Sequence, residues 1–153
     1  MRTLEQIIAE HPFWHRVKSD YFPRISQCAS ELHFGVQQQI FLEGSKADRF
    51  YLIHAGRVAL ETFAPGIGVI TIQTIGEGEV LGSSSLFPPY QWHFSARSID
   101  NTRVVAFDAQ AIRQIAEEDH DFGYDITKRV GQILLQRLQA TRMQLIDFYA
   151  RRA

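Results

Sequence analysis

Three consecutive serines are the residues of this chain whose type and spacing best suit binding chemistry. Ser83, Ser84 and Ser85 follow Gly82 at the end of an apolar run, where a short helix can begin. Backbone N–H groups at a helix N-terminus, together with serine hydroxyls, can hold a small anion. No side chain between residues 80 and 96 carries a full charge at neutral pH, so the Arg or Lys that would complete such a site is missing. The stretch is therefore either a ligand site without its cation or a tight surface loop over a buried Leu-Phe pair.

The residue types and their spacing give little support for catalysis. The histidines form no His-x-His pair of the kind that metal-dependent barrel enzymes use. His11 and His15 are four residues apart, but Pro12 interrupts the helix that would align them. The three serines have no obvious base, and no nucleophile is flanked by glycine on both sides. We expect neither an enzyme, nor a metal site, nor a resident cofactor. The six histidines are His11, His15, His33, His54, His93 and His120.

The composition indicates one soluble domain. Of the 153 residues, 45% are hydrophobic, which is enough for one sizeable core. The formal net charge of −1 argues against a protein that coats nucleic acid. Cys28 is the only cysteine, which excludes an intrachain disulfide and fits a reducing compartment. Charged residues interrupt the start of the chain where a secretory signal would be apolar, and no apolar run approaches the roughly 20 residues of a transmembrane helix. We expect a cytoplasmic protein that does not contact a membrane.

The hydrophobic period divides the chain into three parts within a single domain, residues 1–153. Residues 1–30 indicate N-terminal helices, because Thr3 and Gln6 form a capping-box pattern and the proline after His11 ends the first helix. Residues 31–108 hold short β-branched and aromatic runs of period two, separated by Gly, Pro and Asn turns. Residues 109–153 return to helical spacing. The predicted fold class is mainly β with flanking helices: an antiparallel β-roll (a double-stranded β-helix, jelly-roll-like) that ends in a long C-terminal helix.

The last predicted helix carries an apolar seam. Its spacing of four, three, four and three residues is typical of two helices that coil around each other. We expect this seam to form a homodimer interface. The alternative is a helix that packs wholly within its own domain. The residues of the seam are Leu134, Leu138, Thr141, Leu145 and Phe148.

The motifs of the central part resemble a known family. Gly44 and Gly56 stand at turns on either side of the apolar run Phe50–Ile53, and residues 78–82 read Gly-Glu-Val-Leu-Gly. This pattern is similar to the cyclic nucleotide-binding domain shared by cAMP receptor proteins, kinase regulatory subunits and gated channels. The resemblance runs through nearly the whole chain. It implies a β-roll, a phosphate-binding cassette that begins near Gly82, and a final helix that pairs two subunits and covers the ligand.

The cassette departs from the family pattern at two ligand positions. The family has a Glu for the ribose hydroxyl after the glycine that matches Gly82, and Ser83 stands there instead. About ten residues later the family has an Arg for the cyclic phosphate. Counting from Gly82 places Trp92 or His93 at the position of this Arg, and alignment on the downstream strand favours Trp92. Arg97 lies too far along the strand to be the same residue. A charged hydrogen bond contributes about 1.5 to 3 kcal/mol, so its loss implies binding weaker by about ten- to a hundredfold or more. Alternatively, Trp92 fills the pocket.

The final helix is expected to close the ligand site. Thr141 resembles the threonine that contacts adenine in the family, and Arg142 replaces the next polar residue. An equally simple interpretation is that Thr141 is only a small residue of the seam. DNA-binding relatives carry a helix-turn-helix after this helix, and only residues 149–153 follow Phe148, so we expect no contact with nucleic acid.

The expectation from the sequence is a non-catalytic sensor or regulatory domain, dimeric, which binds cAMP or cGMP weakly or takes a different small anionic ligand. The alternative is a structural adaptor for an unknown partner protein, with its pocket plugged by Trp92. The candidate ligand-binding residues are Gly82, Ser83, Ser84, Ser85, Trp92, His93, Thr141 and Arg142.

Overall fold

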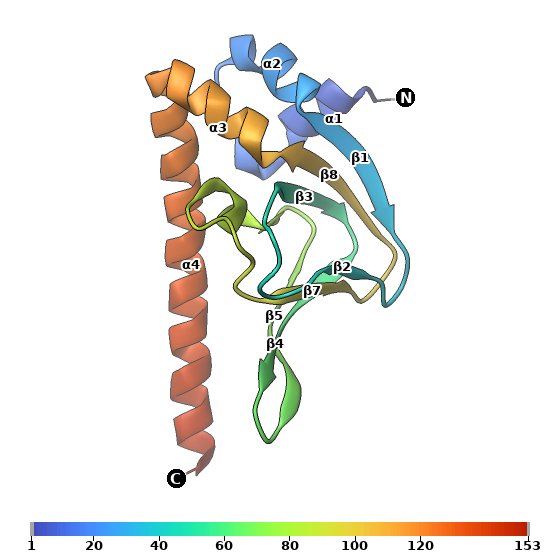
Figure 1. The fold of residues 1–153 in the computed structure, drawn as a ribbon, viewed down its shortest axis with the longest axis vertical. Helices are drawn as coiled ribbons and strands as arrows, with labels where there is room; N and C mark the ends of the chain where they lie inside the picture. The colour runs from blue at the N-terminus through green and yellow to red at the C-terminus, as the bar shows by residue number, and fades with distance from the viewer. Residues whose placement is uncertain (1, 153) are drawn as a thin grey trace. The chain divides into compact units, whose positions relative to one another are not determined.

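A computed structural model describes residues 2–152 in two compact units, and the first ends at Ile115 while the second begins at Ala116. The first unit contains short N-terminal helices, two β-sheets and most of helix α3 (Ala109–Glu118) (Figure 1). The second unit contains the end of α3 and the long helix α4 (His120–Arg152).

The N-terminal segment forms the predicted helices, but the first strand begins at Ala29, two residues before the predicted boundary. Helix α1 (Leu4–Glu10) starts with a capping box, in which Gln6 N donates to Thr3 Oγ1 at 3.1 Å and Thr3 N donates to Gln6 Oε1 at 2.8 Å. The chain leaves the helical conformation at His11, before the proline. Two 3₁₀ turns, η1 (Pro12–Trp14) and η2 (Ser19–Tyr21), lead into helix α2 (Phe22–Gln27), whose proline lies in the first turn.

Eight strands form two four-stranded antiparallel sheets in the first unit. One sheet has the order β1-β8-β3-β6 and the other β2-β7-β4-β5. This arrangement confirms the predicted mainly β fold with flanking helices. The strands are β1 (Ala29–Phe34), β2 (Gln39–Phe41), β3 (Arg49–Ala55), β4 (Arg57–Ala64), β5 (Gly68–Gly76), β6 (Val80–Leu81), β7 (Ser95–Ser98) and β8 (Thr102–Asp108).

The alternation of side chains along β3 separates two apolar layers. Tyr51 and Ile53 point into the core of the roll, with residues contributed by both sheets. Phe50 points to the other face, where its ring stacks on Phe107 at 4.9 Å and meets Phe13 of η1 edge-on at 6.1 Å. The N-terminal segment therefore covers the outer face of the first sheet, and the inner face surrounds the place where the family resemblance puts a ligand.

The turn between β3 and β4 requires glycine. Gly56 has a φ of +95°, and a Cβ at this position would lie 2.5 Å from Asn101 O and 2.6 Å from Thr102 Oγ1. The turn therefore packs directly against the chain that enters β8. From it the β4–β5 hairpin extends beyond the rest of the roll (Figure 1).

Helix α4 is 33 residues long, and most of its side chains are exposed in the single chain. Its early part packs closely on the end of α3, because a Cβ at Gly123 would lie 2.8 Å from Ala116 O. Within residues 2–152, no helix is both long enough and apolar enough to cross a membrane.

Candidate functional site

The cassette begins at Gly82, which joins β6 to the 3₁₀ helix η3 (Ser83–Leu86). Gly82 adopts a left-handed conformation with a φ of +91°. A Cβ here would lie 2.8 Å from Cη2 of Trp92 and 3.2 Å from Arg49 O. Glycine is therefore needed both for the turn and for the close approach of the Trp92 indole. The short helix predicted at the serines is confirmed, as a single 3₁₀ turn.

The serines of η3 are largely turned toward the protein. Ser85 is fully buried, and both its N–H and its hydroxyl donate to Gly82 O, at 3.1 and 2.8 Å. Ser83 is 5% exposed. Ser84 O accepts the N–H of Phe87 at 3.2 Å, which closes the turn. The hydroxyl of Ser85, which the sequence offered for an anion, is thus used inside the cassette.

Trp92 lies in the hydrophobic core of the roll and is 3% exposed. Its ring stacks on Phe41, with centroids 3.7 Å apart and planes at 8°. Its backbone is fixed as well, since Trp92 N donates to Ser45 O at 2.9 Å and Trp92 O accepts from Gly44 N at 2.8 Å. The indole therefore packs between β2 and the cassette, against Gly82.

The surroundings of Trp92 disfavour charge. Burial raises the pKa of Tyr51, a neighbour in the same core cluster, because the phenolate would lose its hydration. An anion placed in this core would pay the same desolvation cost. Arg49 hydrogen-bonds to Tyr51 and lowers its pKa, but the effect of burial is larger. The two other candidate cations do not reach this core, because His93 is exposed and Arg97 is bound to Glu61 and Gln37.

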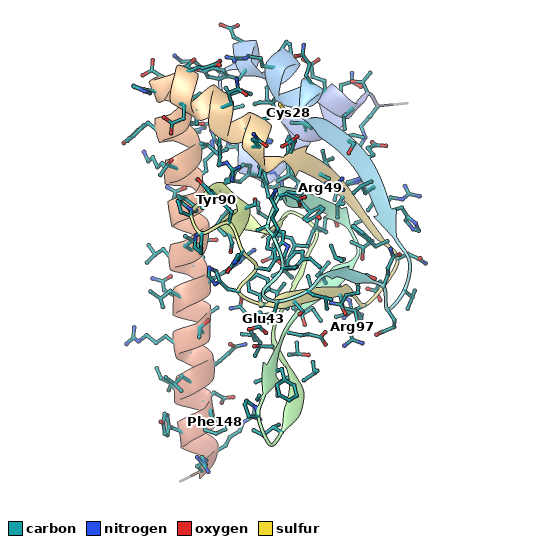
Figure 2. The ribbon with its side chains drawn as sticks, viewed as in Figure 1. Cys28, Glu43, Arg49, Tyr90, Arg97 and Phe148 are labelled. Carbon is teal, nitrogen blue, oxygen red and sulfur yellow. The ribbon has the colours of Figure 1, made fainter. Side chains whose placement is uncertain are left out.

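Arg97 on β7 pairs with Glu61 of β4 and with Gln37. Its Nε donates to Glu61 Oε1 at 3.2 Å, and a second bond from the guanidinium reaches the other carboxylate oxygen. A third bond reaches the side chain of Gln37. The hydrogen bond to Glu61, and then its charge, raise the pKa of Arg97. Figure 2 places Arg97 on the second sheet, so this residue is not a replacement for the missing cassette arginine.

Arg113 is a residue of the cassette that the sequence did not reveal. From α3 it donates through Nη1 to Ser85 O at 2.8 Å, and its guanidinium lies 3.9 Å from the centre of the Tyr90 ring. A cation therefore holds the backbone of η3 from outside the roll. The spacing along the chain carried no signal for this contact, because Arg113 and Ser85 are 28 residues apart and meet only in the folded roll.

The sequence candidates on α4 belong to the second unit. Thr141 and Arg142 are exposed, and the Thr141 hydroxyl donates to Arg137 O one turn earlier at 2.8 Å. The four apolar residues of the predicted seam are about half or more exposed in the single chain: Leu134 is 48% exposed, Leu138 66%, Leu145 54% and Phe148 53%.

No metal centre is formed by the part of the chain that the structure describes, because no three His, Cys, Asp or Glu side chains converge there. His11 is buried and acts in packing: its Nε2 donates to Ile53 O at 3.1 Å and its Nδ1 accepts from Phe13 N at 3.1 Å. Burial lowers the pKa of His11, so the ring is held neutral.

Comparison with known proteins identifies the family of this fold. Residues 31–119 match the model of the cyclic nucleotide-binding domain. The chain is 26% identical over 145 residues to the CRP-like cAMP-activated global transcriptional regulator of Mycobacterium tuberculosis. That match covers 94% of this chain, which spans only 62% of the length of the relative.

Solved structures agree on the fold. A protein of Geobacter metallireducens GS-15, classed with the cyclic nucleotide-binding proteins, is 28% identical with a TM-score of 0.78, over 90% of this chain and 99% of that one. A cyclic nucleotide-binding domain of Methylobacillus flagellatus KT is 18% identical with a TM-score of 0.79, over 94% of this chain and 81% of that one, and it supports the fold alone. Since the family model covers more than half of the sequence, the chain belongs to the cyclic nucleotide-binding domain family.

Proposed function

We propose that this chain is a non-catalytic regulatory domain whose nucleotide pocket is filled by its own tryptophan. The observation that carries the proposal is the packing of Trp92, which is buried, stacked on Phe41 at 3.7 Å and in contact with Gly82. By resemblance this residue stands where relatives have the arginine for the cyclic phosphate. Cyclic nucleotides then bind at millimolar affinity or not at all.

The energetic argument has two parts. The first is the missing arginine, whose charged hydrogen bonds contribute about 1.5 to 3 kcal/mol, or about ten- to a hundredfold in affinity. The second is the indole itself. A ligand phosphate at this place would have to displace a buried Trp side chain, and exposing a large core side chain costs about 1.5 to 3 kcal/mol. The two effects together amount to about 3 to 6 kcal/mol, a range that includes the roughly 4 kcal/mol between micromolar and millimolar affinity.

The test is to restore the family residues and measure binding. In the double variant Ser83→Glu/Trp92→Arg, the Glu supplies a ribose acceptor and the Arg a phosphate partner, and the indole is removed. Once circular dichroism shows that this variant is folded, isothermal titration calorimetry with cAMP and cGMP should show binding that the unmodified protein lacks. A matched control is His93→Arg, which adds a cation one residue later, where the side chain is exposed.

The proposal fails if the unmodified protein binds cAMP or cGMP with micromolar affinity. That outcome would favour the second candidate function, a nucleotide sensor, which is supported by the family match and by the name of the Mycobacterium tuberculosis relative, a cAMP-activated regulator. In that case Trp92 would have to move when the ligand enters.

We further propose that the domain acts as a homodimer through α4. Four apolar residues spaced along the predicted seam are between 48% and 66% exposed in the single chain, and a row of exposed apolar side chains on one helix is typical of a protein–protein interface. Light scattering at tens of micromolar should give a dimer, and the variant Leu138→Asp should give a monomer. A monomeric unmodified protein would refute this part.

The remaining expectations stay proposals. The proposed output of the domain is contact with an unknown partner protein, and the formal net charge of −1 argues against contact with nucleic acid. A cytoplasmic location is consistent with a single cysteine that forms no intrachain disulfide.

A further inference from the structure

A polar cavity of about 550 Å³ opens on the first unit, and neither Trp92 nor η3 lines it. Its walls come from the end of α2 and the start of β1, the turn before β3, Tyr90 in the loop between η3 and β7, and the end of β8 with the first turns of α3. Cys28, Arg49 and Tyr90, labelled in Figure 2, belong to three different parts of this wall. The volume lies in the range of about 300 to 1,000 Å³ that is common for sites of small molecules.

One wall of the cavity is cationic. Arg113 lies over the Tyr90 ring, and Tyr90 O accepts the N–H of Ala47 at 2.8 Å, which places Lys46 beside them. Arg49 lines the same cavity at the start of β3. The Lys46 side chain is exposed, and it forms no ion pair with any residue in the range 2–152. This wall thus presents three positive charges, of which at least one has no protein partner.

Two carboxylates line the cavity at the start of α3. Asp108 N donates to Cys28 O at 2.9 Å, and Ala109 N donates to Asp48 O at 3.1 Å, so the two aspartates flank the beginning of this helix. Asp108 Oδ1 accepts the N–H of Ala111 at 3.2 Å as a helix cap, which leaves Oδ2 for another donor. Both aspartates line the cavity. The lining therefore carries three cations and two carboxylates, a formal charge of +1.

We propose that this cavity binds a free acidic amino acid, an amino dicarboxylate of the size of aspartate or glutamate. Such a ligand carries two carboxylates and one ammonium group at neutral pH, a net charge of −1 that complements the lining. Its carboxylates would pair with Lys46, Arg49 and Arg113, and its ammonium group with Asp48 or Asp108. A simple anion would leave the carboxylates of the wall without a partner, and a simple cation would face three like charges.

The cavity is linked to the cassette by one residue. Arg113 lines the cavity, and the same guanidinium donates to Ser85 O in η3. A carboxylate that pairs with Arg113 would compete for this donor, so an occupied cavity would loosen or reorient η3. The proposal does not depend on whether the roll binds a cyclic nucleotide.

Calorimetric titration of the whole chain with L-glutamate and L-aspartate tests the proposal. We expect one of them to bind. L-Glutamine and L-asparagine lack the second carboxylate and glutarate lacks the ammonium group, so each of these should bind more weakly by about tenfold or more. Lys46→Ala should weaken the amino acid by about three- to tenfold. Lys18→Ala removes an exposed lysine that does not line the cavity and should leave binding unchanged.

Three results would overturn it. One is that neither L-glutamate nor L-aspartate binds at about 10 mM, which would mean that the binding free energy is weaker than about 3 kcal/mol. Another is glutarate or inorganic phosphate binding as tightly as the amino acid, which would show a simple anion site. The third is equal affinity of the unmodified protein and Lys46→Ala. Because the probes are not nucleotides, these outcomes are separate from those for the Trp92 pocket.

Discussion

Replacing Trp92 with alanine should destabilise the fold severely, because the side chain serves as part of the core. Trp92 is 3% exposed and belongs to the cluster that contains Phe41, Tyr51 and Leu81. Truncation of a buried Trp to Ala typically costs about 3 to 5 kcal/mol. For a chain of this length the loss corresponds to a fall of about 6 to 20 °C in the melting temperature.

A double-mutant cycle on the stacked rings of Trp92 and Phe41 separates their mutual interaction from the rest of the stability loss. Phe41→Ala and the double variant with Trp92→Ala complete a cycle, and the coupling between the two rings should be about 0.5 to 1.5 kcal/mol. Trp92→Phe keeps an aromatic ring on Phe41 and should cost less than Trp92→Ala. Urea unfolding followed by far-ultraviolet circular dichroism is the suitable assay, because it does not depend on tryptophan fluorescence.

A loss below about 1 kcal/mol for Trp92→Ala would refute the reasoning, since surface substitutions have effects of about 0.5 kcal/mol or less. It would mean that the indole is easily displaced and that the pocket is open to a ligand. A coupling near zero between Trp92 and Phe41 would contradict the stacked geometry in the same way.

Three further predictions concern the scaffold. Gly56→Ala should cost well over 1 kcal/mol in urea unfolding, because its Cβ would meet Asn101 O at 2.5 Å, whereas Gly66→Ala, at a φ of +82° with open space around it, should cost about 1 kcal/mol; equal losses would contradict the packing of this turn. Arg113→Met should cost about 1 to 2 kcal/mol and speed hydrogen exchange in residues 83–86, and unchanged exchange there would show that Arg113 does not hold η3. Burial lowers the pKa of His11 in the fold, so the unfolded chain takes up a proton first and stability should fall as the pH drops below about 6.5. His54 shifts in the same direction for the same reason, so the test is the difference between the unmodified protein and His11→Asn in urea midpoints from pH 7.5 to about 5, and identical pH profiles would contradict the role of His11.

The fold followed from the sequence because its signals are local. Each signal depends on residues a few positions apart. They are the capping box at Thr3 and Gln6, the end of α1 before Pro12, and the period-two runs between glycine turns. The 3₁₀ turn at Ser83 was also predictable from Gly82 and the serines that follow it.

The site was predictable only in part, because its contacts are formed between distant segments. Counting along the chain brought Trp92 to the cassette but left open whether the indole points into the roll. The sequence also could not show that the Ser85 hydroxyl bonds back to Gly82 O, since this depends on the conformation of one turn. Arg113 was missed because it reaches the cassette from α3, and the cavity beside it has walls from four separate segments.

The central claim is that Trp92 occupies the place of the nucleotide phosphate, and direct titration of the unmodified protein with cAMP tests it. We predict no saturable heat with cAMP below the millimolar range, since the cation is missing and the indole must be displaced. Saturable binding with a dissociation constant of about 10 μM or lower would contradict the claim.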